Sequence, residues 1–278
     1  MRIINAIMVI GLVVLAAGCV EIQSTAKNVV SISSPIEITQ TFEDEFEALD
    51  VIELVIDGYA GDIKISQSDD TDKVSLVSEL VVRGRTEEAV QEAVGKLRLA
   101  SKISSNTMTL KVESKKIMNN DVNSLNNTYT LIIPKTIVKL NIMNDTGDTI
   151  LDGSFEDVVA TRDVGDLIIN GAVNNLDSKT DVGDVKLDGS IGSIKLKSNV
   201  GDAKLVLREN VSNSNLEIKH DISDVKIYLP KGSTISNDSN TNAKIKSTDI
   251  TYSDDGVTIK NNSKSMTEII IYDLERLN

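Results

Sequence analysis

The sequence predicts an all-β protein, a parallel β-solenoid with 18-residue coils, each made of two nine-residue halves, and one helix in its N-terminal part. Three observations predict this fold. Gly-Asp pairs recur with a constant period that equals the length of one coil. Between those pairs, apolar residues alternate with polar ones at the spacing of short strands. Aromatic residues make up 3% of the chain and Trp is absent, so the core must be filled by aliphatic and β-branched side chains, which favour strands.

The regular repeats cover about residues 144–207. Their Gly-Asp pairs are Gly147-Asp148, Gly165-Asp166, Gly183-Asp184 and Gly201-Asp202. A second turn column has the same period, at Asp152-Gly153, Asn170-Gly171 and Asp188-Gly189. Apolar columns precede the glycines at Val164, Val182 and Val200, and follow them at Leu151, Ile169, Leu187 and Leu205. A fixed period of this kind indicates a solenoid in which each coil stacks on the one before.

The spacing inside one repeat argues against the left-handed hexapeptide β-helix, whose turns have the same length but are built from three faces of six. From Val182 to Val200 the apolar residues are separated by steps of 3, 2, 4, 3, 2 and 4, so the half-period is nine rather than six. Each coil is therefore expected to be a flattened loop of two short strands. Degenerate copies at Ile222–Ile227 and Gly61–Ile65 predict that the atypical ends belong to the same stack.

Outside the repeats the pattern predicts more short strands and one helix. The N-terminal strands are expected at residues 36–38, 51–56, 63–65, 74–82, 108–112 and 129–133. The helix begins after Thr86, a suitable N-cap, and its apolar face carries Val90, Val94 and Leu97. Strands at residues 244–246, 257–259 and 269–272 are expected to close the far end.

The segment 1–18 has the pattern of a secretory signal. Arg2 supplies a positive charge, an apolar run extends from Ile3 to Leu15, and small residues lead to Cys19, the only cysteine of the chain. This ending resembles a prokaryotic lipobox. It predicts cleavage before Cys19, lipid on that cysteine, a Ser-rich tether over 19–35, and one domain over 36–278 on the outer side of the membrane. An uncleaved anchor helix and a secreted protein with a chance cysteine are the alternatives.

Charge and cysteine content exclude several classes of function. The formal net charge of −13 argues against nucleic-acid binding, which needs a basic surface, and against adsorption to anionic lipids. The membrane partner is therefore expected to be reached through the N-terminal lipid. A single thiol allows no internal disulfide. An acidic surface of this kind attracts divalent cations or basic partners.

Two flanking segments extend the comparison to a known family. Leu131-Ile132-Ile133-Pro134-Lys135 precedes the repeats, and Ile227-Tyr228-Leu229-Pro230-Lys231-Gly232 follows them. Together with the Gly-Asp units they resemble the putative-adhesin family of prokaryotic surface β-solenoid domains, which is related to toast-rack-like and head-GIN-like domains. The resemblance covers about residues 36–275. It implies an extracytoplasmic domain, often attached to a membrane anchor, and it supplies no catalytic motif.

Few residues are candidates for chemistry. His220 is the only histidine, and Cys19 is taken by the lipid, so His-based catalytic triads and His/Cys zinc sites are not expected. The sequence has neither a Walker loop nor a dinucleotide-binding fingerprint. No cofactor and no catalytic residue are predicted.

The aspartates after the glycines are the candidates for a metal site. Asp148, Asp166, Asp184 and Asp202 are expected to form a ladder, and Asp145, Asp163 and Asp181 a second one ending in Asn199. Oxygen ligands in a row suit Ca²⁺. The alternative, which the sequence favours, is that each carboxylate caps backbone N–H groups of a turn. Lys186 and Lys204 could offset part of the charge.

The expected function is that of a non-enzymatic surface module for adhesion, scaffolding or interaction with the cell envelope or an extracellular ligand. The alternative is a Ca²⁺-dependent enzyme acting on envelope or extracellular polysaccharide. In that case Arg162, the only arginine inside the repeats, would be the base, beside Asp163 and Asp181. Uniform repeats without insertions and with almost no aromatic residues argue against such a cleft.

Overall fold

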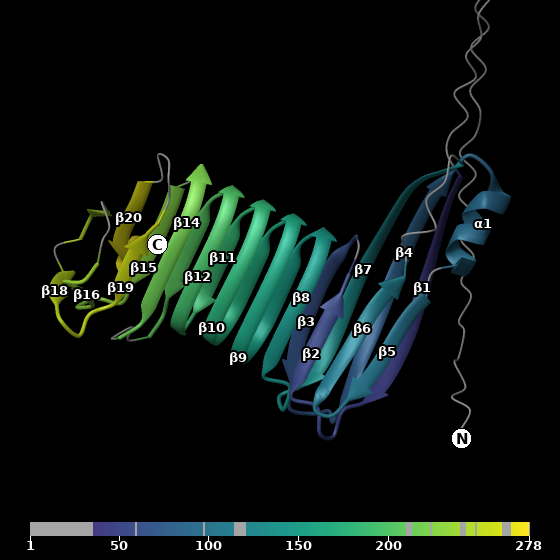
Figure 1. Ribbon diagram of the computed structural model, residues 1–278, viewed down its shortest axis with the longest axis horizontal. Coiled ribbons are helices and arrows are strands. Elements are labelled where there is room, and N and C mark those ends of the chain that lie inside the picture. Colours follow the sequence, from purple (N-terminus) through teal and green to yellow (C-terminus); the bar gives the residue numbers. More distant parts are fainter. Residues whose placement is uncertain are drawn as a thin grey trace, which may run out of the picture.

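The structure is a computed structural model that describes residues 36–58, 60–96, 98–113, 121–209, 213–222, 224–239, 243–247, 249–262 and 268–277. The predicted signal peptide, Cys19 and the tether lie outside these residues. The body is elongated, with β1 (Ile36–Glu47) at one end and β20 (Glu268–Asp273) at the other (Figure 1). Within the described part of the chain, no helix is long and apolar enough to cross a bilayer.

Parallel strands form the central part. They are β8 (Lys139–Thr146), β9 (Thr149–Val164), β10 (Leu167–Val182), β11 (Val185–Gly189), β12 (Ile191–Val200), β13 (Ala203–Leu207), β14 (Asn215–Ile222) and β15 (Asp224–Leu229). Leu167 pairs with Thr149 on one side and with Val185 on the other. These partners hold the equivalent positions in the repeats before and after it, so the sequence period is also the register of neighbouring strands.

The N-terminal part mixes parallel and antiparallel pairs. Its strands are β1, β2 (Glu53–Asp57), β3 (Asp62–Ser68), β4 (Lys73–Gly84), β5 (Arg98–Ser104), β6 (Thr107–Glu113) and β7 (Val122–Pro134). β2 and β3 join the central strands in parallel, whereas β1–β4, β4–β7 and β5–β6 are antiparallel. The expectation of a parallel arrangement over all of 36–278 is therefore wrong here. Ser105 and Asn106 alone connect β5 to β6, and a connection this short permits only a hairpin.

The predicted helix is α1 (Glu87–Lys96), which packs against β4 and β1. Thr86 is its N-cap, because its hydroxyl accepts a hydrogen bond of 3.2 Å from the N–H of Ala89. Val90 and Val94 are buried as predicted. Leu97, the third residue of the predicted apolar face, lies outside the described residues.

The C-terminal strands close the other end. They are β16 (Thr234–Ser236), β17 (Lys244–Ile245), β18 (Thr251–Ser253), β19 (Thr258–Asn261) and β20, followed by the 3₁₀ helix η1 (Leu274–Leu277). β19 and β20 continue the parallel pairing of β14 and β15, and β16 and β18 form a small parallel sheet of their own. The three strands predicted from the sequence for this end are all present.

One continuous apolar core runs through the stack. The predicted inward column is confirmed, since Leu151, Ile169, Leu187 and Leu205 are at most 1% exposed. The other aligned column lies on the surface: Val164, Val182 and Val200 are 44–47% exposed. Each of these valines immediately precedes a corner glycine, where the turn points two consecutive residues outward and breaks the strand alternation.

Candidate functional site

The Gly-Asp corners bring neighbouring coils into very close contact. Gly147, Gly165, Gly183 and Gly201 have φ values of +126°, +137°, +149° and +145°, a region that L side chains rarely adopt. A Cβ on Gly183 would lie 2.0 Å from the carbonyl oxygen of Gly165 in the coil before it. Glycine is therefore required here both by the backbone conformation and by the close approach of the next coil.

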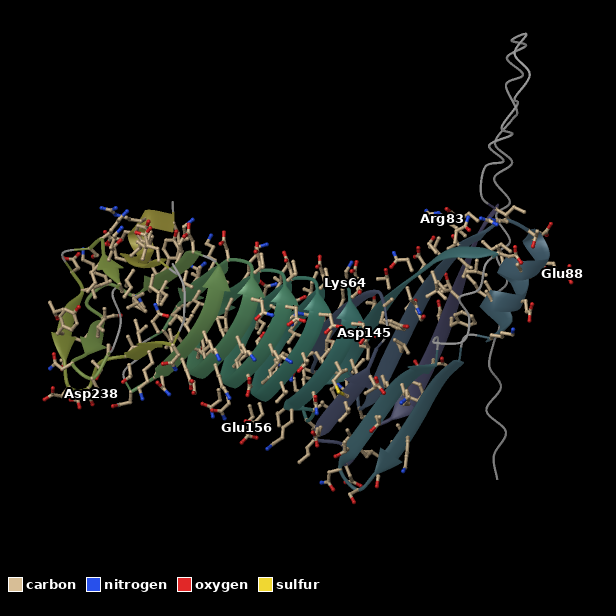
Figure 2. All side chains as sticks on the ribbon, turned by 45° about the horizontal axis from the view of Figure 1, so that its top comes forward. Lys64, Arg83, Glu88, Asp145, Glu156 and Asp238 are labelled. Carbon is tan, nitrogen blue, oxygen red and sulfur yellow. The ribbon has the colours of Figure 1, made fainter. Side chains whose placement is uncertain are left out.

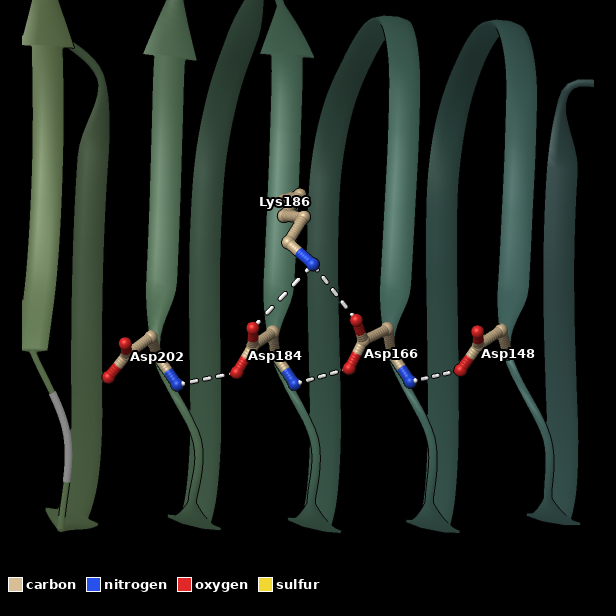
Figure 3. Close-up of polar contacts among 5 residues, drawn as sticks. All are labelled: Asp148, Asp166, Asp184, Lys186 and Asp202. Atoms are coloured by element: carbon tan, nitrogen blue, oxygen red, sulfur yellow. Dashed lines mark hydrogen bonds and ion pairs between the residues drawn. The ribbon is translucent and has the colours of Figure 1, made fainter.

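The aspartates form the predicted ladder at these corners, and backbone groups occupy it (Figure 3). The N–H of Asp166 donates a hydrogen bond of 2.8 Å to the carboxylate of Asp148. The N–H groups of Asp184 and Asp202 donate in the same way to the carboxylate one coil earlier, each at 2.9 Å. Asp62 and Asp224 extend the ladder at its two ends, with bonds of 3.0 and 2.9 Å. Both degenerate copies found in the sequence therefore belong to the ladder.

Lys186 bridges two steps of the ladder. Its ammonium lies 2.9 Å from the carboxylate of Asp166 and 3.6 Å from that of Asp184 (Figure 3). The hydrogen bond to Asp166 raises the pKa of Lys186. Burial alone would raise the pKa of Asp166, but the N–H of Asp184 and the ammonium of Lys186 outweigh it and lower that pKa. The ladder is thus held by hydrogen bonds and by one internal cation, as the turn-capping interpretation expects.

A second positive charge lies beneath the same corners. Arg162 on β9 is 1% exposed, and its guanidinium donates a hydrogen bond of 3.2 Å to Ser178. Burial lowers the pKa of Arg162 to about 10, while Asp166 and Asp148 oppose this shift, so the side chain stays charged at neutral pH. Arg162 therefore acts on Asp166 and Asp148 from inside the body, whereas Lys186 pairs with Asp166 from the outside.

The residues of the alternative enzyme hypothesis do not meet. Arg162 points into the core, whereas Asp163 and Asp181 are exposed on the outside of the corner. The second predicted ladder, which includes Asp163 and Asp181, ends at Asn199 as expected. The side-chain amide of Asn199 donates a hydrogen bond of 3.1 Å to the carboxylate of Asp181. His220 lies on β14 beside Ser198 of β12. Among the described residues, no group of three or more His, Cys, Asp or Glu side chains is arranged to hold a metal ion.

A shallow hollow of about 410 Å³ lies on the face formed by β8, β9, β10 and β12. Lys139 lies 2.8 Å from the carboxylate of Asp157, which also accepts a hydrogen bond of 2.8 Å from the Asn175 amide. The bond to Lys139 lowers the pKa of Asp157 and raises that of Lys139. Glu53, Val159, Asp177, Ser193 and Lys195 are among the other residues that line it, and no aromatic side chain does. Our reading of the sequence missed the hollow, because its residues come from several coils and share no motif.

No protein-family model and no curated protein matches the sequence. Among solved structures, a putative adhesin from Bacteroides fragilis is 17% identical, with a TM-score of 0.50 over 84% of this chain and 97% of that one. A putative cell adhesion protein from Clostridium sporogenes is 15% identical, with a TM-score of 0.30 over 86% and 100% of the two chains. A putative lipid binding protein from Parabacteroides distasonis is 14% identical, with a TM-score of 0.36 over 84% and 96%. The first of these structures alone carries the comparison, and it shows that this chain has the fold of a putative adhesin, as the resemblance in the sequence implies.

Proposed function

We propose that this chain is an exported lipoprotein whose residues 36–278 form a β-solenoid with 18-residue coils and act as a non-enzymatic adhesion, scaffold or envelope-interaction module. Cleavage before Cys19 and lipid on that cysteine would hold the protein to the outer side of the membrane. Residues 19–35 would serve as the tether, and the ligand would belong to the envelope or to the extracellular space.

The observation that carries this proposal is the register of the central strands. Parallel neighbours are offset by one repeat period along β9, β10, β11 and β13, so coils of nearly equal size add up to an elongated body. β1, the first described strand, lies at one end of this body, and β15–β20 lie at the other (Figure 1). An anchor before β1 would therefore hold the C-terminal end away from the membrane, where a partner is met.

Two observations support a binding role over the enzymatic alternative. Arg162 is buried, so its guanidinium is out of reach of a polysaccharide on the outer surface. In the hollow, Lys139 pairs with Asp157 and lowers its pKa, whereas a general acid needs a raised one. Asp177 also has a cationic partner, because Lys195 lies 3.6 Å from its carboxylate.

Bacteria that produce the full chain would test this function. They are mixed with purified envelope polymers, beside cells that produce Cys19→Ser, and both the bound polymer and its chain length are measured. We expect saturable capture of at least one polymer by the wild-type cells alone, with its chain length unchanged. Shortening of the polymer would show an enzyme, and capture of none of the polymers would contradict the adhesion module.

A further inference from the structure

Two tyrosines stack on each other at the end of the body opposite β1. Tyr228 of β15 and Tyr272 of β20 are neighbours in the parallel register. Their ring centroids are 5.1 Å apart and the planes are inclined by 18°. Both side chains are partly exposed. Figure 2 shows that side chains ending in nitrogen and oxygen atoms surround much of the body. In a chain with five tyrosines, three phenylalanines and no Trp, this pair is an unusual concentration of aromatic surface.

Three cations surround this pair. The ammonium of Lys204 lies 5.6 Å from the ring centroid of Tyr228. The ammonium of Lys246 and the guanidinium carbon of Arg276 each lie 6.0 Å from the ring centroid of Tyr272. β15 lies between β13, which carries Lys204, and β20, which carries Tyr272. Tyr228 and Tyr272 are direct neighbours in the register, whereas Lys204 is in register with Lys226 and so lies diagonally from Tyr228. We call Lys204, Tyr228, Tyr272, Lys246 and Arg276 the distal row.

The charge of the distal row is opposite to that of the protein. The chain has a net charge of −13, yet within the described residues Lys204, Lys246 and Arg276 take part in no ion pair. Three nearby carboxylates have other cations as their ion-pair partners: Glu268 pairs with Lys244, Glu275 with Lys231, and Asp188, on which the charge of Lys204 also acts, with Arg208. Lys246 contributes to the lowered pKa of Glu268, but the larger cause is the hydrogen bond from Lys244. The row thus presents exposed cationic donors beside two phenol groups.

Such a row fits a ligand with repeated negative charges. Ammonium and guanidinium groups donate hydrogen bonds and accept none, so carboxylate or sulfate groups are their natural partners. The ring faces of Tyr228 and Tyr272 lie against each other and under the cations, which leaves little open face for stacking a nucleic-acid base. The phenol hydroxyls can donate to and accept from sugar hydroxyls.

We infer that the distal row binds an acidic polysaccharide lying across β13, β15 and β20. This inference rests on the proposed function, which it deepens by giving the ligand class and the place of binding. β15 and β20, which carry the two tyrosines, lie toward the end of the body opposite β1, where an anchored module would meet an external polymer (Figure 1). Screening by salt should weaken the contact, because its cations are exposed.

The test measures binding of the full chain, purified in detergent, to polygalacturonate, with neutral dextran and double-stranded DNA as comparison polymers. The variant Lys204→Gln/Lys246→Gln removes two charges of the distal row and keeps long polar side chains. Lys179→Gln/Lys197→Gln is the matched control, because it removes two exposed lysines from β10 and β12. Thermal unfolding of both variants checks that each is folded.

We expect the wild type to bind polygalacturonate and not dextran, and the row variant to lose about tenfold in affinity, while the control stays within about twofold. Equal loss in both variants, or no loss in the row variant, would overturn the assignment. DNA binding as tight as polygalacturonate binding would overturn the choice of a polysaccharide. If polygalacturonate does not bind but cells displaying the chain still capture another envelope polymer, this inference fails and the proposed function stands. If both measurements fail, the proposed function fails with it.

Discussion

The backbone N–H of Asp184 donates a hydrogen bond of 2.9 Å to the carboxylate of Asp166, the residue that occupies the same corner position one coil earlier. The same bond joins each neighbouring pair from Asp62 to Asp224. Hydrogen bonds to a carboxylate are stronger than those between neutral groups. A row of like charges, which would repel one another if they were only stacked, therefore also ties the coils together.

Calcium should have no special effect on this ladder. If the carboxylates only accept backbone N–H groups, Ca²⁺ and NaCl at equal ionic strength should raise the melting temperature alike, because both act by screening. Thermal unfolding followed by circular dichroism, in matched CaCl₂ and NaCl series, measures this. A rise with low-millimolar Ca²⁺ well beyond matched NaCl, lost in Asp166→Asn/Asp184→Asn, would instead reveal a metal site through its binding to the folded state.

Replacing the corner glycine Gly183 with alanine should be strongly destabilising. The added methyl group would lie 2.0 Å from the Gly165 carbonyl oxygen, and φ is +149°. We expect a loss of more than about 2 kcal/mol in the free energy of unfolding. Gly95→Ala is the control, since nothing lies within 4 Å of its added Cβ and the residue is helical, so a gain of up to about 1 kcal/mol is expected. Urea titration of both variants checks the opposite signs.

The inward column makes a separate prediction. Leu187 is 1% exposed, so Leu187→Asp would bury an unpaired charge and should cost about 4 kcal/mol or more, enough to unfold neighbouring coils. Lys197→Asp, on an exposed position of β12, should change the melting temperature little. Circular-dichroism melts would measure both. The reverse order of stability would mean that the inside and outside of the strands are assigned the wrong way round.

The periodic features of the fold could be predicted from the sequence because each was repeated. The corner glycines, the aspartate ladder and the column of Leu187 occur once per coil, so a one-dimensional period determines which residues become neighbours. The antiparallel pairing of β1 with β4 has no such repeat. It depends on where distant segments meet, which the period does not determine.

Side-chain direction at single positions was harder to predict. Arg162 shares a column with the buried residues Asn144, Thr180 and Ser198, and this alignment could have placed it in the core. Its charge and its proximity to Asp163 in the sequence suggested an exposed site instead. The stacking of Tyr228 on Tyr272 had no signal in the sequence, because the two are far apart along the chain and neither belongs to a regular repeat.

The proposed lipid anchor predicts the partitioning of the whole protein. Wild-type protein from a bacterial host should enter the detergent-rich phase of a Triton X-114 separation, because an acyl chain contributes about 0.8 kcal/mol per buried CH₂ group. Cys19→Ser should stay in the aqueous phase, because it lacks the acyl chains. Immunoblots of the two phases measure the difference. Recovery of the wild type in the aqueous phase would contradict lipidation.

Acid should weaken the fold in part through Asp188. The guanidinium of Arg208 donates two hydrogen bonds to its carboxylate, at 2.6 and 2.7 Å, and they lower the pKa of Asp188 below its ordinary value of 3.8. A carboxyl group whose pKa is lower in the folded state adds stability above its unfolded pKa, and that stability is lost as the pH falls through the folded value. The melting temperature should therefore fall below about pH 4, and less steeply in Arg208→Gln than in the wild type. Lys179→Gln, which removes a positive charge from another exposed position, is the control. If both variants follow the wild-type curve, the pair of Asp188 and Arg208 contributes nothing to acid sensitivity.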